Sequence, residues 1–265
     1  MRATHLAVAA AAVTAACGGL LGLDEDDDAP SPATSNDDGG LGDDGGSSDA
    51  FGGSDASSPS SYCATQDAAY CWDFDEGKSP SEGWYSVVAN NGSFGLATDA
   101  SSSPPASAFF SALDAGASSE LTLFVPTGSS AIDMTWSALV PLPPPSSVVL
   151  AKIGANIGTA KPAVSILAYP NSVAVLDEPL SGTAQLPASS TALPRDRFVR
   201  FHFRVSFETQ HVSLDMDGTN VVDNVLQSTW DKAQAYRLVV GVRQDTSVPG
   251  YVYEMFLDDV LIRFE

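Results

Sequence analysis

The stretch FHFRVSFETQHVSLDMDG, residues 201–218, decides the fold class of this 265-residue chain. Two runs in this stretch alternate apolar and polar residues, and a short polar connection around 208–211 separates them. A period of two is typical of strands with one buried and one solvated face, and the short connection favours an antiparallel hairpin. The predicted buried face of this hairpin consists of Phe201, Phe203, Val205, Phe207, Val212, Leu214 and Met216.

The same pattern continues on both sides of the hairpin. Asp217-Gly218 supplies a tight turn into a third strand around 220–222. A change of phase at Asp258-Asp259 predicts a β-bulge in the last strand, and one short segment, 229–235, could be helical. Residues 61–265 are therefore predicted to form one all-β domain. Its other strands are expected at 108–113, 120–125, 132–140, 148–153, 163–169, 173–176, 236–243 and 251–264.

The N-terminus has the features of a secretory signal. Arg2 precedes an apolar run that ends in Thr14-Ala15-Ala16-Cys17, and this run is too short to cross a bilayer as a helix. The ending resembles the lipobox of bacterial lipoproteins, although Thr14 stands where that pattern prefers Leu. The resemblance implies cleavage after residue 16, attachment of diacylglycerol and palmitate at Cys17, and a secreted protein anchored by lipid in the bacterial cell envelope, at the outer membrane or cell surface. The alternative is an ordinary secretory signal cut near Ala16.

Residues 18–60 differ sharply in composition from the rest of the chain. They are mainly Gly, Ser, Asp, Ala and Pro, with 11 acidic residues and no Lys or Arg. Such a segment buries too little apolar surface to offset chain entropy, so it is expected to be a disordered acidic linker. The full chain has a net charge of −21, and residues 61–265, with 11 basic and 22 acidic residues, have a net charge of −11. Nucleic acid is therefore not an expected partner, and the membrane is expected only through the lipid.

Three segments together resemble the concanavalin A-like lectin and glucanase superfamily, which includes laminin-G-like modules. They are CWDFDEG at 71–77 with Gly83-Trp84, the hairpin at 201–218, and MFLDDVLIRF at 255–264. The resemblance covers most of 70–265 and implies a two-sheet antiparallel jelly-roll sandwich in which the last strand lies beside the first. Galactose-binding-like jelly rolls end in a similar strand and are the alternative within the same class.

The resemblance does not carry an activity. Glucan-hydrolysing members carry two glutamates that flank an aspartate on one strand, and these carboxylates supply the nucleophile and the general acid. No two glutamates of this chain have the spacing of that motif. His202 and His211 could form a metal pair across the hairpin, but two surface histidines are the simpler interpretation. The chain is therefore expected not to be an enzyme. We expect a non-catalytic module that binds carbohydrate. One alternative is a structural or adhesive protein that binds another envelope protein. The other is a divergent glycan-cleaving enzyme.

Two kinds of binding residue stand out. Trp84, Trp136 and Trp230 could stack on sugars, and Trp84 and Trp230 are the better candidates because they lie at element edges; packing in the core is the alternative. Structural calcium is the possible cofactor, because hard carboxylate oxygens gather at both ends of the domain and the first and last strands are expected to meet. The candidate calcium ligands are Asp73, Asp75, Glu76, Asp258 and Asp259.

The chain has three cysteines, and lipid on Cys17 would leave two. Cys63 and Cys71 lack the spacing and the companions of a zinc site. In an oxidising compartment they are expected to form one disulfide that closes a short loop at the start of the domain.

Overall fold

The computed structural model describes residues 62–265, apart from 76–78, 115, 145, 156–161, 181, 187–190 and 245–249. These residues form a sandwich of two antiparallel sheets, and the only helix among them is a single 3₁₀ turn, η1 (Tyr62–Thr65). None of the described helices has the length and apolarity needed to cross a membrane. The all-β jelly-roll prediction is thus confirmed, whereas the possible helix at 229–235 is wrong, because these residues form turns and coil.

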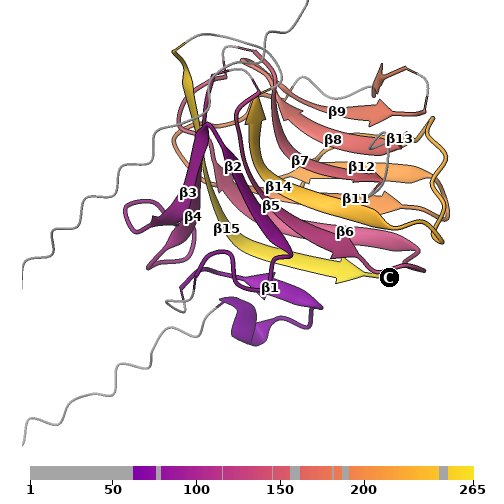
Figure 1. Cartoon of the computed structure of the whole chain (residues 1–265), viewed down its shortest axis with the longest axis horizontal. Helices are drawn as coiled ribbons and strands as arrows, with labels where there is room; N and C mark the ends of the chain where they lie inside the picture. The colour runs from indigo at the N-terminus through magenta and orange to yellow at the C-terminus, as the bar shows by residue number, and fades with distance from the viewer. Residues whose placement is uncertain are drawn as a thin grey trace, which may run out of the picture. The chain divides into compact units, whose positions relative to one another are not determined.

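Sheet A has eight strands, and the last strand of the chain lies at its centre (Figure 1). In order across the sheet they are β13 (Thr219–Val225), β12 (His211–Met216), β11 (Val199–Ser206), β6 (Ala131–Leu139), β15 (Val252–Phe264), β4 (Ser107–Leu113) and β3 (Gly92–Ala97), with β1 (Tyr70–Trp72) also paired to β15.

Sheet B has seven strands and packs against sheet A through the apolar faces of both. In order they are β10 (Ala184–Gln185), β9 (Val173–Glu178), β8 (Ala163–Ala168), β7 (Val148–Ala155), β14 (Tyr236–Gln244), β5 (Ser118–Val125) and β2 (Ser86–Asn90).

The opening hairpin follows its predicted pattern. Phe201, Phe203 and Val205 of β11 are fully buried, whereas the intervening side chains face outward. Asp217 and Gly218 both have positive φ, 50° and 75°, as the tight turn into β13 requires. The alternation therefore identifies the inner face of sheet A correctly.

Strand β15 changes partners at its acidic bulge. On one side it pairs with β4 up to Leu257 and with β1 from Val260 onwards. Its pairing with β6 shifts between Asp258 and Leu261, and Asp259 has a φ of 51°. The bulge predicted at this acid pair is confirmed, and so is the expectation that the last strand lies beside the first (Figure 1).

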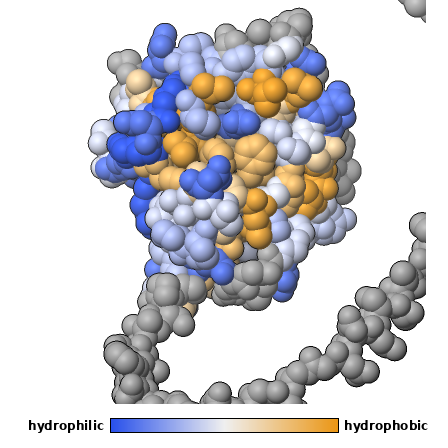
Figure 2. Space-filling model, turned by 90° about the vertical axis from the view of Figure 1, so that its left-hand side faces the viewer, coloured by the Kyte–Doolittle hydropathy of each residue, from blue (hydrophilic) through white to orange (hydrophobic). Residues whose placement is uncertain are grey.

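One edge of the sandwich is apolar. Strands β2 and β3 follow each other in the chain but belong to different sheets, with Asn91 at φ 48° between them. Figure 2 shows apolar residues gathered on the face where these two edge strands lie. The exposed large apolar side chains of β2, β3 and β4 are Val87, Val88, Leu96 and Leu113.

Candidate functional site

The outer face of sheet B has a polar groove at its centre. Inward-facing residues of β14, such as Leu238 and Val240, lie in the core, so the alternate residues Arg237, Val239 and Arg243 face outward. Neighbouring strands β5 and β7 contribute residues in register with them, since Val239 pairs with Thr122 on one side and Lys152 on the other. The groove has a volume of about 200 Å³. Its lining consists of Ser86, Val88, Glu120, Thr122, Lys152, Gly154, Ala155, Arg237, Val239 and Arg243.

Small residues make the face hollow. Gly154 lies opposite Arg237 and also opposite Ala163 of β8, and Ser165 lies opposite Lys152. Gly241 lies opposite Glu120, where a Cβ atom would be only 2.2 Å from the carbonyl oxygen of Ser119. The long charged side chains of the groove therefore stand beside shorter lining residues, such as Gly154, Ala155 and Thr122.

The cationic side chains of the groove differ in whether a carboxylate pairs with them. The ammonium group of Lys152 lies 2.6 Å from a carboxylate oxygen of Glu178, and the guanidinium group of Arg243 lies 3.7 Å from a carboxylate oxygen of Glu120. Arg237, by contrast, makes no side-chain hydrogen bond or ion pair with any residue in the described part of the chain. Its guanidinium group therefore keeps donors available for an anionic ligand.

This arrangement combines three chemical capacities on one surface. Arg237 can bind a carboxylate, Glu120 can accept a proton, and Lys152 can donate one. The side chains of Glu120 and Lys152 are only 15% and 18% exposed, so their electrostatic interactions are less screened than those at an open surface. None of these residues was predicted from the sequence. The available signal was the charged alternation within 236–243, but the adjacency of β5, β14 and β7 could not be read from it.

The two histidines are not paired with each other. Nε2 and Nδ1 of His202 lie 3.1 and 3.5 Å from carboxylate oxygens of Asp133 and Asp215. His211 lies instead against Asp223. The described residues contain no group of three metal-ligating side chains. These histidines are therefore partly exposed and contact carboxylates on the outer face of sheet A, in agreement with the simpler interpretation.

The three predicted sugar-stacking tryptophans are buried. Trp84, Trp136 and Trp230 are 8%, 1% and 3% exposed, so the expectation that Trp84 and Trp230 are accessible is wrong. Trp84 stacks on Trp72 with ring centroids 4.4 Å apart, and Trp136 stacks on Phe201 at 5.0 Å. Trp230 packs against Phe207 and Tyr236. All three fill the core, because large aromatic surfaces gain most from burial.

The predicted calcium ligands meet at the β1–β15 junction, but they are occupied by the protein itself. Asp258 accepts hydrogen bonds from the backbone amides of Ser102 and Ser103. Asp259 and Asp75 accept bonds from the Ser103 hydroxyl and the Ala106 amide.

Asp73 accepts hydrogen bonds from the Cys63 and Asp75 amides, and Glu76 lies outside the described residues. These acids therefore fasten the 101–106 connection and the start of the domain. Calcium binding here stays a prediction.

Asp258 makes stability depend on pH. Burial raises the pKa of this carboxyl to about 7; amide hydrogen bonds lower it, and the charge of Asp259 raises it further. Because the pKa is raised in the folded state, the stabilising contribution is complete below about pH 4 and is lost as pH rises to about 7. We expect denaturant titrations to show a free energy of unfolding that falls over this interval, by roughly 1 kcal/mol per pH unit from this group. Asp258→Asn should flatten that slope, and an equal slope in the variant would contradict the assignment.

The cysteine predictions fall on different parts of the chain. Cys63 and Cys71 form a disulfide with Cα atoms 5.6 Å apart, which confirms the predicted pair. The signal at 1–16, Cys17 and the linker up to residue 60 lie outside the described residues, so the lipidation prediction is not tested by the structure.

Comparisons with known proteins identify similar folds but no sequence family. No family model matches the chain, and no curated protein matches it. Among solved structures, an endo-β-1,4-glucuronan lyase from the fungus Trichoderma reesei is 13% identical, with a TM-score of 0.60 over 75% of this chain and 96% of that chain.

Two further structures are similar at 16% identity. The cellulose induced protein Cip1 has a TM-score of 0.51 over 71% of this chain and 92% of that chain. A family 7 alginate lyase, A1-II', in complex with substrate has a TM-score of 0.50 over 65% of this chain and 81% of that chain. These likenesses show a shared concanavalin A-like jelly-roll sandwich.

The comparisons overturn the expected function. Two of these similar structures are polysaccharide lyases, which contradicts the predictions of a non-catalytic binding module and of no enzymatic activity. The prediction of no activity rested on a missing glutamate motif, which supplies the pair of carboxyl groups that glycoside hydrolases typically use. Elimination breaks a glycosidic bond without such a pair, so the absence excluded one mechanism rather than catalysis. The glycan-cleaving alternative is the one that these findings favour.

Proposed function

We propose that this chain is a polysaccharide lyase that cleaves an acidic glycan in the groove of sheet B. The observation that carries the proposal is Arg237, a cation without a partner among the described residues, beside Glu120 and Lys152 on a hollowed sheet face. The similarity of the fold to a glucuronan lyase and an alginate lyase supports the same reaction class. A carboxylated sugar complements the groove, because a guanidinium group can bind a carboxylate through two parallel hydrogen bonds.

The proposed reaction is a β-elimination. Arg237 binds the uronate carboxylate and offsets the negative charge that develops when the neighbouring carbon, C5, loses its proton. Glu120 takes this proton as general base. The electron pair of the C5–H bond forms the C4–C5 double bond, the C4–O glycosidic bond breaks, and Lys152 protonates the departing oxygen. The step is redox-neutral, and it leaves an unsaturated uronate at the new non-reducing end.

The geometry assigns supporting roles to the remaining charges. Glu178 holds the ammonium group of Lys152 at 2.6 Å and so positions the proton donor. Arg243 lies 3.7 Å from Glu120 and orients its carboxylate.

The test is an assay of the chain against polyglucuronate, alginate, polygalacturonate and a neutral glucan. We expect ultraviolet absorbance from the conjugated double bond to increase with one of the three acidic polymers. No increase is expected with the neutral glucan. New reducing ends without that absorbance would indicate hydrolysis and overturn the lyase assignment. A lack of cleavage of all three acidic polymers would overturn the proposed substrate class.

We further propose that the enzyme is displayed in the bacterial envelope by lipid on Cys17. The sequence around this cysteine and the acidic, Gly- and Ser-rich composition of 18–60 support a lipid anchor followed by a flexible tether. Cys17→Ala should shift the protein from the membrane fraction to the soluble fraction after expression in a lipoprotein-processing bacterium. Cys17→Ser serves as a second variant, and equal membrane partition of wild type and both variants would contradict lipidation.

A further inference from the structure

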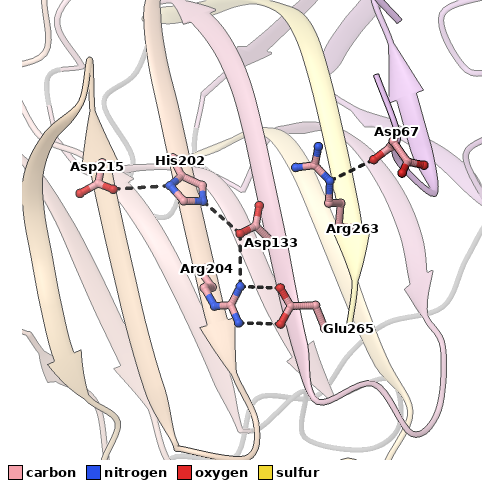
Figure 3. Close-up of polar contacts among 7 residues, drawn as sticks. All are labelled: Asp67, Asp133, His202, Arg204, Asp215, Arg263 and Glu265. Carbon is pink, nitrogen blue, oxygen red and sulfur yellow. Dashed lines mark hydrogen bonds and ion pairs between the residues drawn. The ribbon is translucent and has the colours of Figure 1, made fainter. Parts of the chain in front are cut away.

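The outer face of sheet A carries a second hollow, which we call the cup. It has a volume of about 460 Å³ and lies on the other side of the sandwich from the groove. Arg263, His202 and Asp133 surround it from strands β15, β11 and β6 (Figure 3). The cup is completed by Thr135, Arg200, Asp215 and Gly218.

Short side chains explain the depth of the cup. Thr135 lies between His202 of β11 and Leu261 of β15 in the register of the sheet. The neighbouring outward residue of β6 is Ser137, opposite Arg200. Ser137 is buried and does not line the cup, so Thr135 is the short side chain between the longer polar groups of β11 and β15.

Both arginines of the cup are oriented by the first residues of the domain. Nη2 of Arg200 donates to the hydroxyl of Tyr62 at 3.0 Å, and its guanidinium group lies over the Tyr62 ring. Nε of Arg263 donates to the carbonyl oxygen of Asp67 at 3.1 Å (Figure 3). The Cys63–Cys71 disulfide closes the loop that holds Asp67, and Tyr62 directly precedes this loop. The contacts position the guanidinium groups without using all of their donors.

The acids of the cup are already engaged. Asp133 is shared by His202 and Arg204, and Asp215 accepts from the side-chain amide of Asn220 at 2.9 Å. The Nη groups of Arg263 and Nη1 of Arg200, in contrast, make no hydrogen bond within the described residues. The cup therefore presents free guanidinium donors beside carboxylate, imidazole and hydroxyl groups that can bind further hydroxyls.

We infer that the cup is a second binding site for an acidic saccharide unit, separate from the cleaving groove. The carboxylate of the sugar binds Arg200 and Arg263, and its hydroxyl groups bind Thr135, His202 and the two aspartates. His202 and Asp215 of the cup are 40% and 30% exposed, against 15% and 18% for Glu120 and Lys152 of the groove, which suits attachment to a polymer rather than proton transfer. This inference rests on the proposed function, because the same class of polymer would occupy both sites.

Calorimetry of the mature full-length chain with a glucuronate trisaccharide tests the inference. We expect two bound trisaccharides for the wild type, one for Arg200→Gln with Arg263→Gln, and none detectable when Arg237→Gln is added. Thr135→Phe should also remove one, because the ring fills the floor of the cup and leaves both arginines in place. Cellotriose, which lacks carboxylates, is the control ligand and should bind the cup at least tenfold more weakly.

Kinetics separate this inference from the proposed function. The cup variants should cleave short oligomers at the wild-type rate and degrade long polymer severalfold more slowly at low polymer concentration. Unchanged stoichiometry in both the double arginine variant and Thr135→Phe would overturn the cup. Loss of one bound trisaccharide in a chain that cleaves no acidic polymer would support the cup and overturn the proposed catalysis.

Discussion

Replacing Arg237 with Gln is expected to lower kcat/KM on the cleaved polyuronide by about 100-fold or more. Loss of one preorganised donor that stabilises developing charge commonly has an effect of this order. The effect should appear in kcat as well as KM, because the negative charge on the substrate carboxylate grows during proton removal. The ultraviolet assay of the unsaturated product measures both constants.

Arg197→Gln is the matched control for this experiment. Arg197 is an exposed arginine whose side chain pairs with Asp217 at 2.6 Å beside the hairpin turn of sheet A. The control should retain wild-type kcat/KM. Activity of Arg237→Gln within threefold of the control would remove Arg237 from the reaction and with it the main support for the groove as the active site.

Gly241→Ala is expected to destabilise the fold by roughly 3 kcal/mol or more. Gly241 has a φ of 142°, which L-residues with a side chain rarely adopt. A Cβ atom there would also lie 2.2 Å from the Ser119 carbonyl oxygen and 2.8 Å from Cα of Glu120. Because these contacts are with backbone, relief requires the strands β5 and β14 to move apart. Denaturant unfolding measures the loss.

Gly95→Ala is the control for the Gly241 experiment. Gly95 also lies within a strand, β3, but a Cβ atom there would meet no other atom within 4 Å. Its free energy of unfolding should stay within about 0.5 kcal/mol of wild type. Equal stability of the two variants would show that the close approach at Gly241 can relax without cost. Any folded Gly241→Ala protein should also lose activity, because the displaced segment carries Glu120.

The sequence allowed the inner faces of the long strands to be predicted because their alternation is regular. Edge strands β2 and β3 were missed, since they contain small and polar residues and bury little on either face. The tryptophans were misplaced for a related reason: a Trp beside Gly or Asp can point inward from an element edge, as Trp84 and Trp230 do. Local sequence predicts which residues of a strand share a face, but it does not predict whether a residue at the end of the strand is buried by a neighbouring loop.

The groove could not be predicted because its residues come from strands that are far apart in the chain. Glu120, Lys152 and Arg237 converge only after β5, β7 and β14 become neighbours. The acid pair at 258–259 was located correctly in space, but its hydrogen bonds to the 101–106 connection depend on a loop conformation that composition does not determine. Adjacency between strands and the partners of buried charges are properties of the completed sheet.

The position of β15 has a consequence for biogenesis. This 13-residue strand is the last in the chain, yet it lies between β6 and β4 and pairs with β1. Sheet A therefore remains divided until β15, which follows every other described strand in the sequence, has been synthesised, and the sandwich cannot close before then.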